Sequence, residues 1–136
     1  MTAPHFNLII QCADVIKALP IEDWGSQNPQ GKRAAGLVAR WSIERAFEAV
    51  LLSEGVSIPS DRSIRNLHRL SGVQLTALQT SFLDDVDREV TSAEPSEEQM
   101  DEYYFGCCQL ALGIVGAVKT LLALHTVAAR RFQVNQ

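Results

Sequence analysis

The sequence has little of what builds metal sites, disulfide frameworks or redox centres. Its 136 residues contain three cysteines, an odd number, with no CxxC spacing and no paired histidines. Such a set fits neither a zinc site nor a disulfide framework. Because free cysteine is mostly buried, we expect the adjacent Cys107 and Cys108 to be small core residues. No P-loop, dinucleotide fingerprint or Ser, His and Asp arrangement is present, so the common enzyme classes have little support and we expect no cofactor.

Positive charge is not in excess either. The 12 Lys and Arg residues stand against 16 Asp and Glu residues, which gives a formal charge of −4. This balance is no global reason to expect nucleic-acid binding, although a local basic patch stays open. The N-terminal segment lacks the features of a signal peptide. The uncharged run at residues 103–118 is shorter than the roughly 20 residues that cross a bilayer. We therefore expect a cytoplasmic protein without membrane contact.

Helical periodicity is the strongest signal that the sequence does have. A content of 46% apolar and 21% charged residues is typical of a soluble globular protein, and the length suits one domain, residues 1–136. Apolar residues recur at spacings of three and four, which predicts an all-α protein. Pro4 opens a first predicted helix and Pro20 ends it.

The clearest predicted helix lies in the stretch of residues 33–55. It is expected to stop at Gly55, where a left-handed C-terminal cap would sit. Arg40 and Glu44 stand at the spacing of a helical ion pair. Its expected core side consists of Ala39, Ile43, Ala46, Phe47, Val50 and Leu51. The opposite side is predicted to be a charged stripe of Arg33, Arg40, Glu44 and Glu48.

Two tryptophans flank the start of this helix. Residues 21–31 are rich in turn formers and predict a connecting loop, with Trp24 folded back onto the bundle. Trp24 and Trp41 could be platforms on which a base stacks. No basic or aromatic cluster surrounds them in the sequence, so we interpret both as hydrophobic anchors.

A short cationic segment, residues 61–70, is the best candidate anion site. Ser60 or Asp61 is expected to cap a helix there. The inner side is predicted to hold Ile64, Leu67 and Leu70. The outer side is predicted to hold Arg62, Arg65, His68 and Arg69, which we take as candidate ligand-binding residues. The alternative is a solvated face whose arginines pair with the acidic segment at residues 84–102.

That acidic segment lies between two further predicted helices. Apolar residues of the first are Leu75, Leu78, Phe82, Val86 and Val90. A run of carboxylates could hold a divalent cation, but the spacing does not match a calcium loop, so we expect no metal. Ser96 with Gln99 matches the capping box that begins a helix.

The last predicted helix is the most apolar part of the chain. Taken from Glu97 to Arg130 it is about 50 Å long, and we expect it to be central and covered on most sides. Glycine is costly inside a helix, so a neighbouring helix should approach closely, from the same chain or from a dimer partner. The residues concerned are Gly106, Gly113, Gly116 and Ala117. His125, Arg130 and Arg131 are expected to favour the negative end of the helix dipole.

The order of these elements resembles the HEPN superfamily (higher eukaryotes and prokaryotes nucleotide-binding). The resemblance rests on the helix ARWSIERAFEAVLLSEG, a short loop, H-x-L at residues 68–70, an amphipathic helix, an acidic turn and a long apolar helix. It covers residues 34–124, roughly two thirds of the chain. It implies an up-and-down bundle of four to five helices, usually a homodimer, acting beside a nucleotidyltransferase-type partner or in toxin–antitoxin or defence systems.

Some members of this superfamily are ribonucleases that use an arginine and a histidine without metal. Arg62 and His68 have the matching spacing, five residues between them. This pair lies between the second and third long helices, whereas the family's pair lies near the start of the last one. Three readings remain open. They are a non-catalytic accessory module that binds nucleotide, nucleic acid or a partner protein, a ribonuclease toxin that uses Arg62 and His68, and a helical scaffold that holds a partner through its last helix. We lean towards the first.

Overall fold

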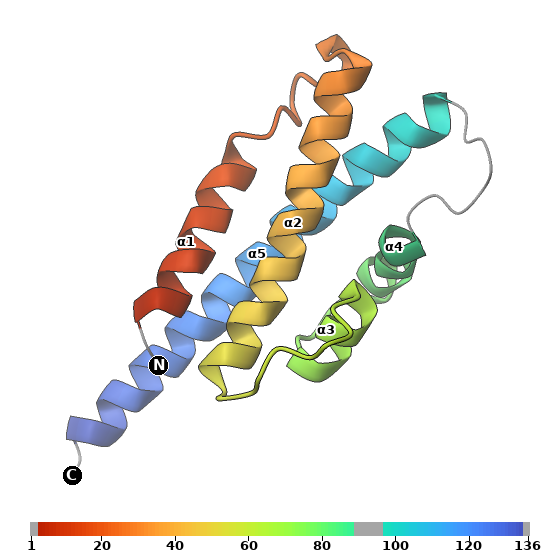
Figure 1. The fold of residues 1–136 in the computed structure, drawn as a ribbon. Helices are drawn as coiled ribbons and strands as arrows, with labels where there is room; N and C mark the ends of the chain where they lie inside the picture. The colour runs from red at the N-terminus through yellow and green to blue at the C-terminus, as the bar shows by residue number, and fades with distance from the viewer. Residues whose placement is uncertain (1–2, 89–96, 135–136) are drawn as a thin grey trace.

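The protein is an all-α bundle, as the periodicity predicts (Figure 1). The computed structural model describes residues 3–88 and 97–134, and the side chains of residues 7–86 and 98–124. This part contains five α-helices and no strand. Their bounds are α1 Ala3–Lys17, α2 Pro29–Ser53, α3 Ile64–Ser71, α4 Ala77–Arg88 and α5 Glu97–Val134, with a short 3-10 helix, η1, at Trp24–Ser26.

Three long helices form the body of the bundle. α1 and α2 run in opposite directions and both lie against α5, while α3 and α4 sit to one side of α2 and α5 (Figure 1). The core between the long helices is fully buried or nearly so: Ile9, Cys12, Ile43, Phe47, Cys107, Cys108 and Ile114. The prediction that Cys107 and Cys108 are core residues is therefore confirmed.

Local caps explain where α2 begins and ends. The Asn28 side chain accepts a hydrogen bond of 2.7 Å from the Gly31 N–H, and Pro29 occupies the first helical position. The helix therefore begins four residues before the predicted Arg33. At the other end Gly55 has a φ of 75°, so the predicted left-handed residue is confirmed.

α3 begins later than the sequence suggests. Ser63, not Ser60 or Asp61, is its N-cap, and the Ser63 hydroxyl accepts a hydrogen bond of 3.3 Å from the Asn66 N–H. The buried residues of the helix are Ile64, Leu67 and Ser71. Leu70 is 38% exposed, so its predicted inward position is wrong. Gly72, with a φ of 68°, is the left-handed residue that ends the helix.

α4 also differs from the predicted stripe. Thr76 and Gln79 form a capping box, in which the Thr76 hydroxyl accepts from the Gln79 N–H at 3.1 Å and the Gln79 side chain accepts from the Thr76 N–H at 2.9 Å. Leu75 therefore precedes the helix. Leu78, predicted to face inward, is 82% exposed, and Leu83 is buried in its place. Val90 and Ser96 lie outside the described residues, as do the side chains of residues 87–97.

α5 has 38 residues and is about 57 Å long at 1.5 Å per residue. It packs against α1, α2 and α4, but the prediction that it is covered on most sides is wrong. In its most apolar stretch, between Glu98 and Leu124, 44% of the 18-residue window is buried. By length and composition alone this stretch is a candidate to cross a membrane. The shorter uncharged run at residues 103–118 had predicted no membrane contact. The side chains of His125, Arg130 and Arg131 lie outside the described residues.

Candidate functional site

A polar cleft lies between α3 and α4, near the predicted ligand residues. We call it the α3–α4 cleft, and its volume is about 570 Å³. Its lining combines two arginines, two carboxylates and several uncharged polar groups. The lining residues are Asp61, Ser63, Arg65, Asn66, His68 and Arg69 from the α3 side, and Thr80, Leu83 and Asp84 from α4.

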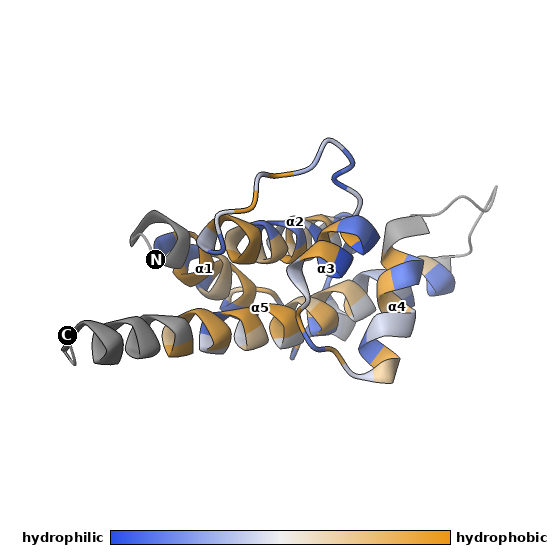
Figure 2. Ribbon diagram, turned by 90° about the horizontal axis from the view of Figure 1, so that it is seen from below, coloured by the Kyte–Doolittle hydropathy of each residue, from blue (hydrophilic) through white to orange (hydrophobic). Residues whose placement is uncertain are grey.

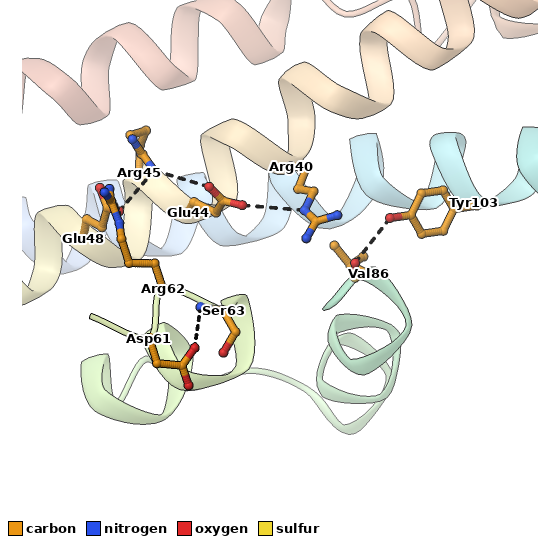
Figure 3. Close-up of polar contacts among 9 residues, drawn as sticks. All are labelled: Arg40, Glu44, Arg45, Glu48, Asp61, Arg62, Ser63, Val86 and Tyr103. Atoms are coloured by element: carbon orange, nitrogen blue, oxygen red, sulfur yellow. Dashed lines mark hydrogen bonds and ion pairs between the residues drawn. The ribbon is translucent and has the colours of Figure 1, made fainter. Parts of the chain in front are cut away.

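The segment that leads into α3 is held by its own side chains. Asp61 Oδ1 accepts a hydrogen bond of 3.1 Å from the Ser63 N–H (Figure 3). The Asn66 amide donates to the Asp61 carbonyl at 2.7 Å. These bonds, together with the Ser63 cap, position the first turn of α3 against the cleft. The polar groups on this wall are thus ordered by short-range contacts.

The two arginines of the cleft have different partners. Arg65 Nε lies 3.2 Å from Asp84 Oδ1, across the cleft. The side chains of this pair are 66% and 39% exposed, respectively. Arg69 instead donates to the uncharged side-chain oxygen of Asn66 at 2.6 Å. The alternative of arginines paired with the acidic segment therefore holds for Arg65, while no ion pair to Arg69 is found in the part of the chain described.

Arg62 does not line the cleft. It precedes the N-cap of α3, and its guanidinium turns towards α2 (Figure 3). Its Nη2 and Nε donate to Glu48 Oε1 at 2.6 Å and 3.2 Å. The hydrogen bond to Glu48 raises the pKa of Arg62 above its ordinary value. The structure therefore separates Arg62 from Arg65 and Arg69, which the predicted helix placed together.

Glu48 belongs to a polar network on α2. It is 6% exposed, and Arg45 Nη2 lies 3.1 Å from its Oε1. Glu44 pairs with Arg45 at 3.3 Å and with Arg40 at 3.6 Å, which confirms the predicted Arg40 and Glu44 pair (Figure 3). Burial raises the pKa of the Glu44 carboxyl, and the neighbouring arginines oppose this.

The predicted charged stripe on α2 missed the burial of Glu48. Helical periodicity places Glu48 on the side away from Phe47, but it cannot show that a segment 14 residues further on covers that side. Arg62 arrives from this segment as a partner for the carboxylate. A buried carboxylate needs such a partner, because desolvation of an unpaired charge is costly.

His68 reaches the cleft but is already hydrogen bonded. Its Nε2 lies 3.0 Å from the Val73 carbonyl oxygen, and a carbonyl accepts only, so this nitrogen carries the proton. Its ring also packs on Phe47, with ring centroids 5.5 Å apart. Arg62 and His68 thus make separate contacts, and only His68 lines the cleft.

The small residues of α5 fall into two groups. A Cβ at Gly106 would lie 2.7 Å from Phe82 Cε2 of α4, and one at Gly113 would lie 2.7 Å from Gln79 Nε2. At Gly116 a Cβ would meet nothing within 4 Å, and Ala117 beside it is exposed. Close helix approach within the chain therefore accounts for the first two glycines and not for Gly116.

Gly36 is a close contact between α2 and α5 that the sequence pattern did not single out. A Cβ at Gly36 would clash with the Tyr104 ring and lie 3.0 Å from Tyr104 Cβ. Gly36 sits within the apolar side of α2, four residues after Lys32 and three before Ala39. Its position on the core side was the available signal, because a core-facing glycine implies a backbone contact.

Trp24 and Trp41 have different environments. Trp24 is 9% exposed and its Nε1 donates to Asp101 Oδ1 at 2.7 Å, so its predicted folding back onto the bundle is confirmed. Lys32 Nζ lies 2.9 Å from the same oxygen. Trp41 is 43% exposed, with the Arg45 guanidinium carbon 5.8 Å from its ring centroid. Its interpretation as a hydrophobic anchor therefore stays a prediction, because the side chain is only partly covered.

The described residues contain no candidate metal site. No group of three or more of their His, Cys, Asp or Glu side chains could hold an ion.

Comparisons of the chain with protein-family models, with curated proteins and with solved structures found no match. The function therefore has to be argued from the geometry of the site.

Proposed function

We propose that this chain is a non-catalytic, HEPN-like binding module that takes a nucleotide phosphate in the α3–α4 cleft. The observation that carries the proposal is the pair Arg65 and Arg69, which stand one helical turn apart on α3 and both line the cleft. Guanidinium groups suit phosphate oxygens because they donate several hydrogen bonds in a fixed plane. The Ser63 and Thr80 side chains add hydroxyl groups on opposite walls.

The size of the cleft favours a single nucleotide. A volume of about 570 Å³ lies within the range of small-molecule sites, roughly 300 to 1,000 Å³. An extended nucleic-acid strand would instead need a continuous cationic track, and the chain carries a net charge of −4.

The geometry supports binding more than RNA cleavage. A ribonuclease that used Arg62 and His68 would need both groups at one phosphate. Arg62 instead donates to the buried Glu48, and His68 Nε2 contacts the Val73 carbonyl. Both would have to exchange these partners before they could act together.

Titration of ATP into the protein at low salt tests the proposal. Arg65→Ala and Arg69→Ala should each weaken binding by about tenfold, as expected for loss of a charge-assisted hydrogen bond. Arg33→Ala on α2 is the matched control, because Arg33 is exposed and does not line the cleft. Binding should weaken as salt rises. Equal affinity in all four proteins, or no binding by any of them, would contradict the proposal.

Incubation with total RNA in EDTA distinguishes the ribonuclease alternative. The proposed binding module should leave the RNA intact. Cleavage that disappears in both Arg62→Ala and His68→Ala, while circular dichroism shows both variants folded, would overturn it. Tight binding of an oligoribonucleotide with no binding of ATP would instead identify nucleic acid as the ligand.

We also propose that the outer side of α5 pairs with a second copy of the chain. One side of α5 faces α1 and α2, and the opposite side is not covered by them (Figure 2). Exposed residues with helical spacing form a weakly polar stripe there: Gln109, Leu112, Gly116, Ala117, Thr120 and Leu124. Because a Cβ at Gly116 would meet no atom of another described helix within 4 Å, a second helix has room to approach it.

Sedimentation velocity tests this pairing. The wild-type chain should sediment as a dimer and Gly116→Trp as a monomer. A Cβ at Gly116 would meet nothing within 4 Å, so we expect the variant to fold, and circular dichroism checks that it does. Gly25→Trp, also in open space but on η1, should remain dimeric. A wild-type monomer at high concentration would contradict the proposal.

A further inference from the structure

One contact in the α3–α4 cleft opposes the binding of an anion. Arg65 Nε lies 3.2 Å from Asp84 Oδ1, so a carboxylate of the protein occupies the position beside the guanidinium that a phosphate oxygen would take. The pair joins α3 to α4, and both residues line the cleft. Any anion that binds Arg65 must either replace Asp84 or accept a like charge next to it.

Among the described side chains, no carboxylate competes in this way for the second arginine. Arg69 donates to the neutral Asn66 side chain, an acceptor that brings no negative charge. The cleft is therefore asymmetric, with one arginine ready for an anion and the other held by a carboxylate. An exposed ion pair contributes little net stability, so a ligand with enough charge can displace Asp84.

We propose that Asp84 is an internal counter-ion that competes with the ligand for Arg65 and makes the cleft selective for adjacent phosphates. This rests on the proposed function of the cleft. A monophosphate gains the Arg69 contact but meets the Asp84 carboxylate near Arg65. A diphosphate or triphosphate reaches both arginines and supplies the extra negative charge that replaces Asp84. Nucleoside diphosphates and triphosphates are accordingly the ligand class that the cleft favours.

Asp84→Asn is the direct test, with ATP and AMP as probes. The variant removes the negative charge and keeps the shape of the side chain. We expect it to bind AMP about two- to fivefold more tightly than the wild type, while ATP affinity rises less. The wild type should prefer ATP to AMP, and Asp84→Asn should reduce this preference.

Asp85→Asn is the matched control, because Asp85 is exposed on the same helix and does not line the cleft. It should change neither affinity. The gain in Asp84→Asn should vanish when Arg65→Ala is added, because the proposed competition acts only through Arg65.

The outcomes separate this inference from the proposed function. Wild-type binding that depends on Arg65 and Arg69 but is unchanged by Asp84→Asn would overturn the inference and leave the binding function standing. A tightening of equal size in Asp85→Asn would also overturn it, because the effect would then be one of net charge. Failure of ATP and AMP to bind both the wild type and Asp84→Asn would overturn both proposals.

Discussion

Glu48 and Arg62 join the second long helix to the segment that leads into α3. Two nitrogens of the Arg62 guanidinium donate to one oxygen of Glu48, at 2.6 Å and 3.2 Å, and Glu48 is almost fully buried. The residues on either side of Arg62, Asp61 and Ser63, line the α3–α4 cleft. Arg62 thus positions the wall of the cleft without reaching into it.

Replacement of Glu48 should be more damaging than replacement of its partner. Glu48→Ala leaves Arg45 and Arg62 without their shared acceptor and opens a gap, which should lower the free energy of unfolding by about 2 kcal/mol. Arg62→Ala should cost less, because Glu48 keeps Arg45. Urea unfolding at neutral pH measures both, with the exposed Glu54→Ala as control. A larger loss in Arg62→Ala would contradict this account of the network.

Two glycine substitutions in the long helices should have opposite effects. Gly36→Ala places a Cβ against Tyr104, whose own Cβ is held by α5 and cannot move aside, so stability should fall by about 1 to 3 kcal/mol. At concentrations low enough to keep the chain monomeric, a Cβ in Gly116→Ala meets no other helix within 4 Å and should stabilise the helix by up to about 1 kcal/mol. Thermal unfolding of both variants checks the prediction. Equal destabilisation would show that Gly116 is also in a close contact.

Acid should weaken the attachment of η1 to α5 through Asp101. Hydrogen bonds from Lys32 and then from Trp24 hold the pKa of the Asp101 carboxyl below its ordinary value of 3.8. A carboxyl with a lowered folded-state pKa contributes stability above its ordinary pKa and loses it as the pH falls through the folded-state value. Asp101→Asn should therefore be less stable than the wild type at neutral pH, and the two should converge as the pH falls below 3.8.

Denaturant unfolding from pH 7 down to the acid limit measures this difference. Many carboxylates protonate over that range. The informative quantity is therefore the difference in free energy of unfolding between the wild type and the variant at each pH. Glu98→Gln, an exposed carboxylate near the start of α5, gives the background. A constant difference between wild type and Asp101→Asn across the range would contradict the prediction.

The three cysteines should be unreactive in the folded protein. All are buried as free thiols, and burial raises the pKa of Cys108 to about 11 and that of Cys12 above its ordinary value. Because the thiolate is the reacting species, little of it forms near neutral pH. Mass spectrometry after brief iodoacetamide treatment at pH 8 should find no label, and three labels after denaturation in guanidinium. Rapid labelling of the native protein would contradict the packing of the core.

The sequence by itself determined the helices and the core side of α2. These signals act over a few residues and can be recognised without knowledge of the fold. They are the spacings of three and four around Phe47, the glycines at Gly55 and Gly72, and the apolar content of α5. The caps were less predictable, because Ser60, Asp61 and Ser63 are all competent caps and only the competition between them sets the start of α3. That shift of a few residues moved Arg62 out of the cationic helix.

Tertiary structure alone decided which charges face a ligand. Arg62, Arg65 and Arg69 are equivalent in sequence, yet one is paired with Glu48 from α2, one with Asp84 from α4, and one with Asn66 one turn away. The partners of the first two stand 14 and 19 residues from them in the chain. Periodicity reports which side of a helix is apolar, but the charge that a side chain meets depends on what packs beside it. For this reason the candidate site became specific only when α3 and α4 were placed together.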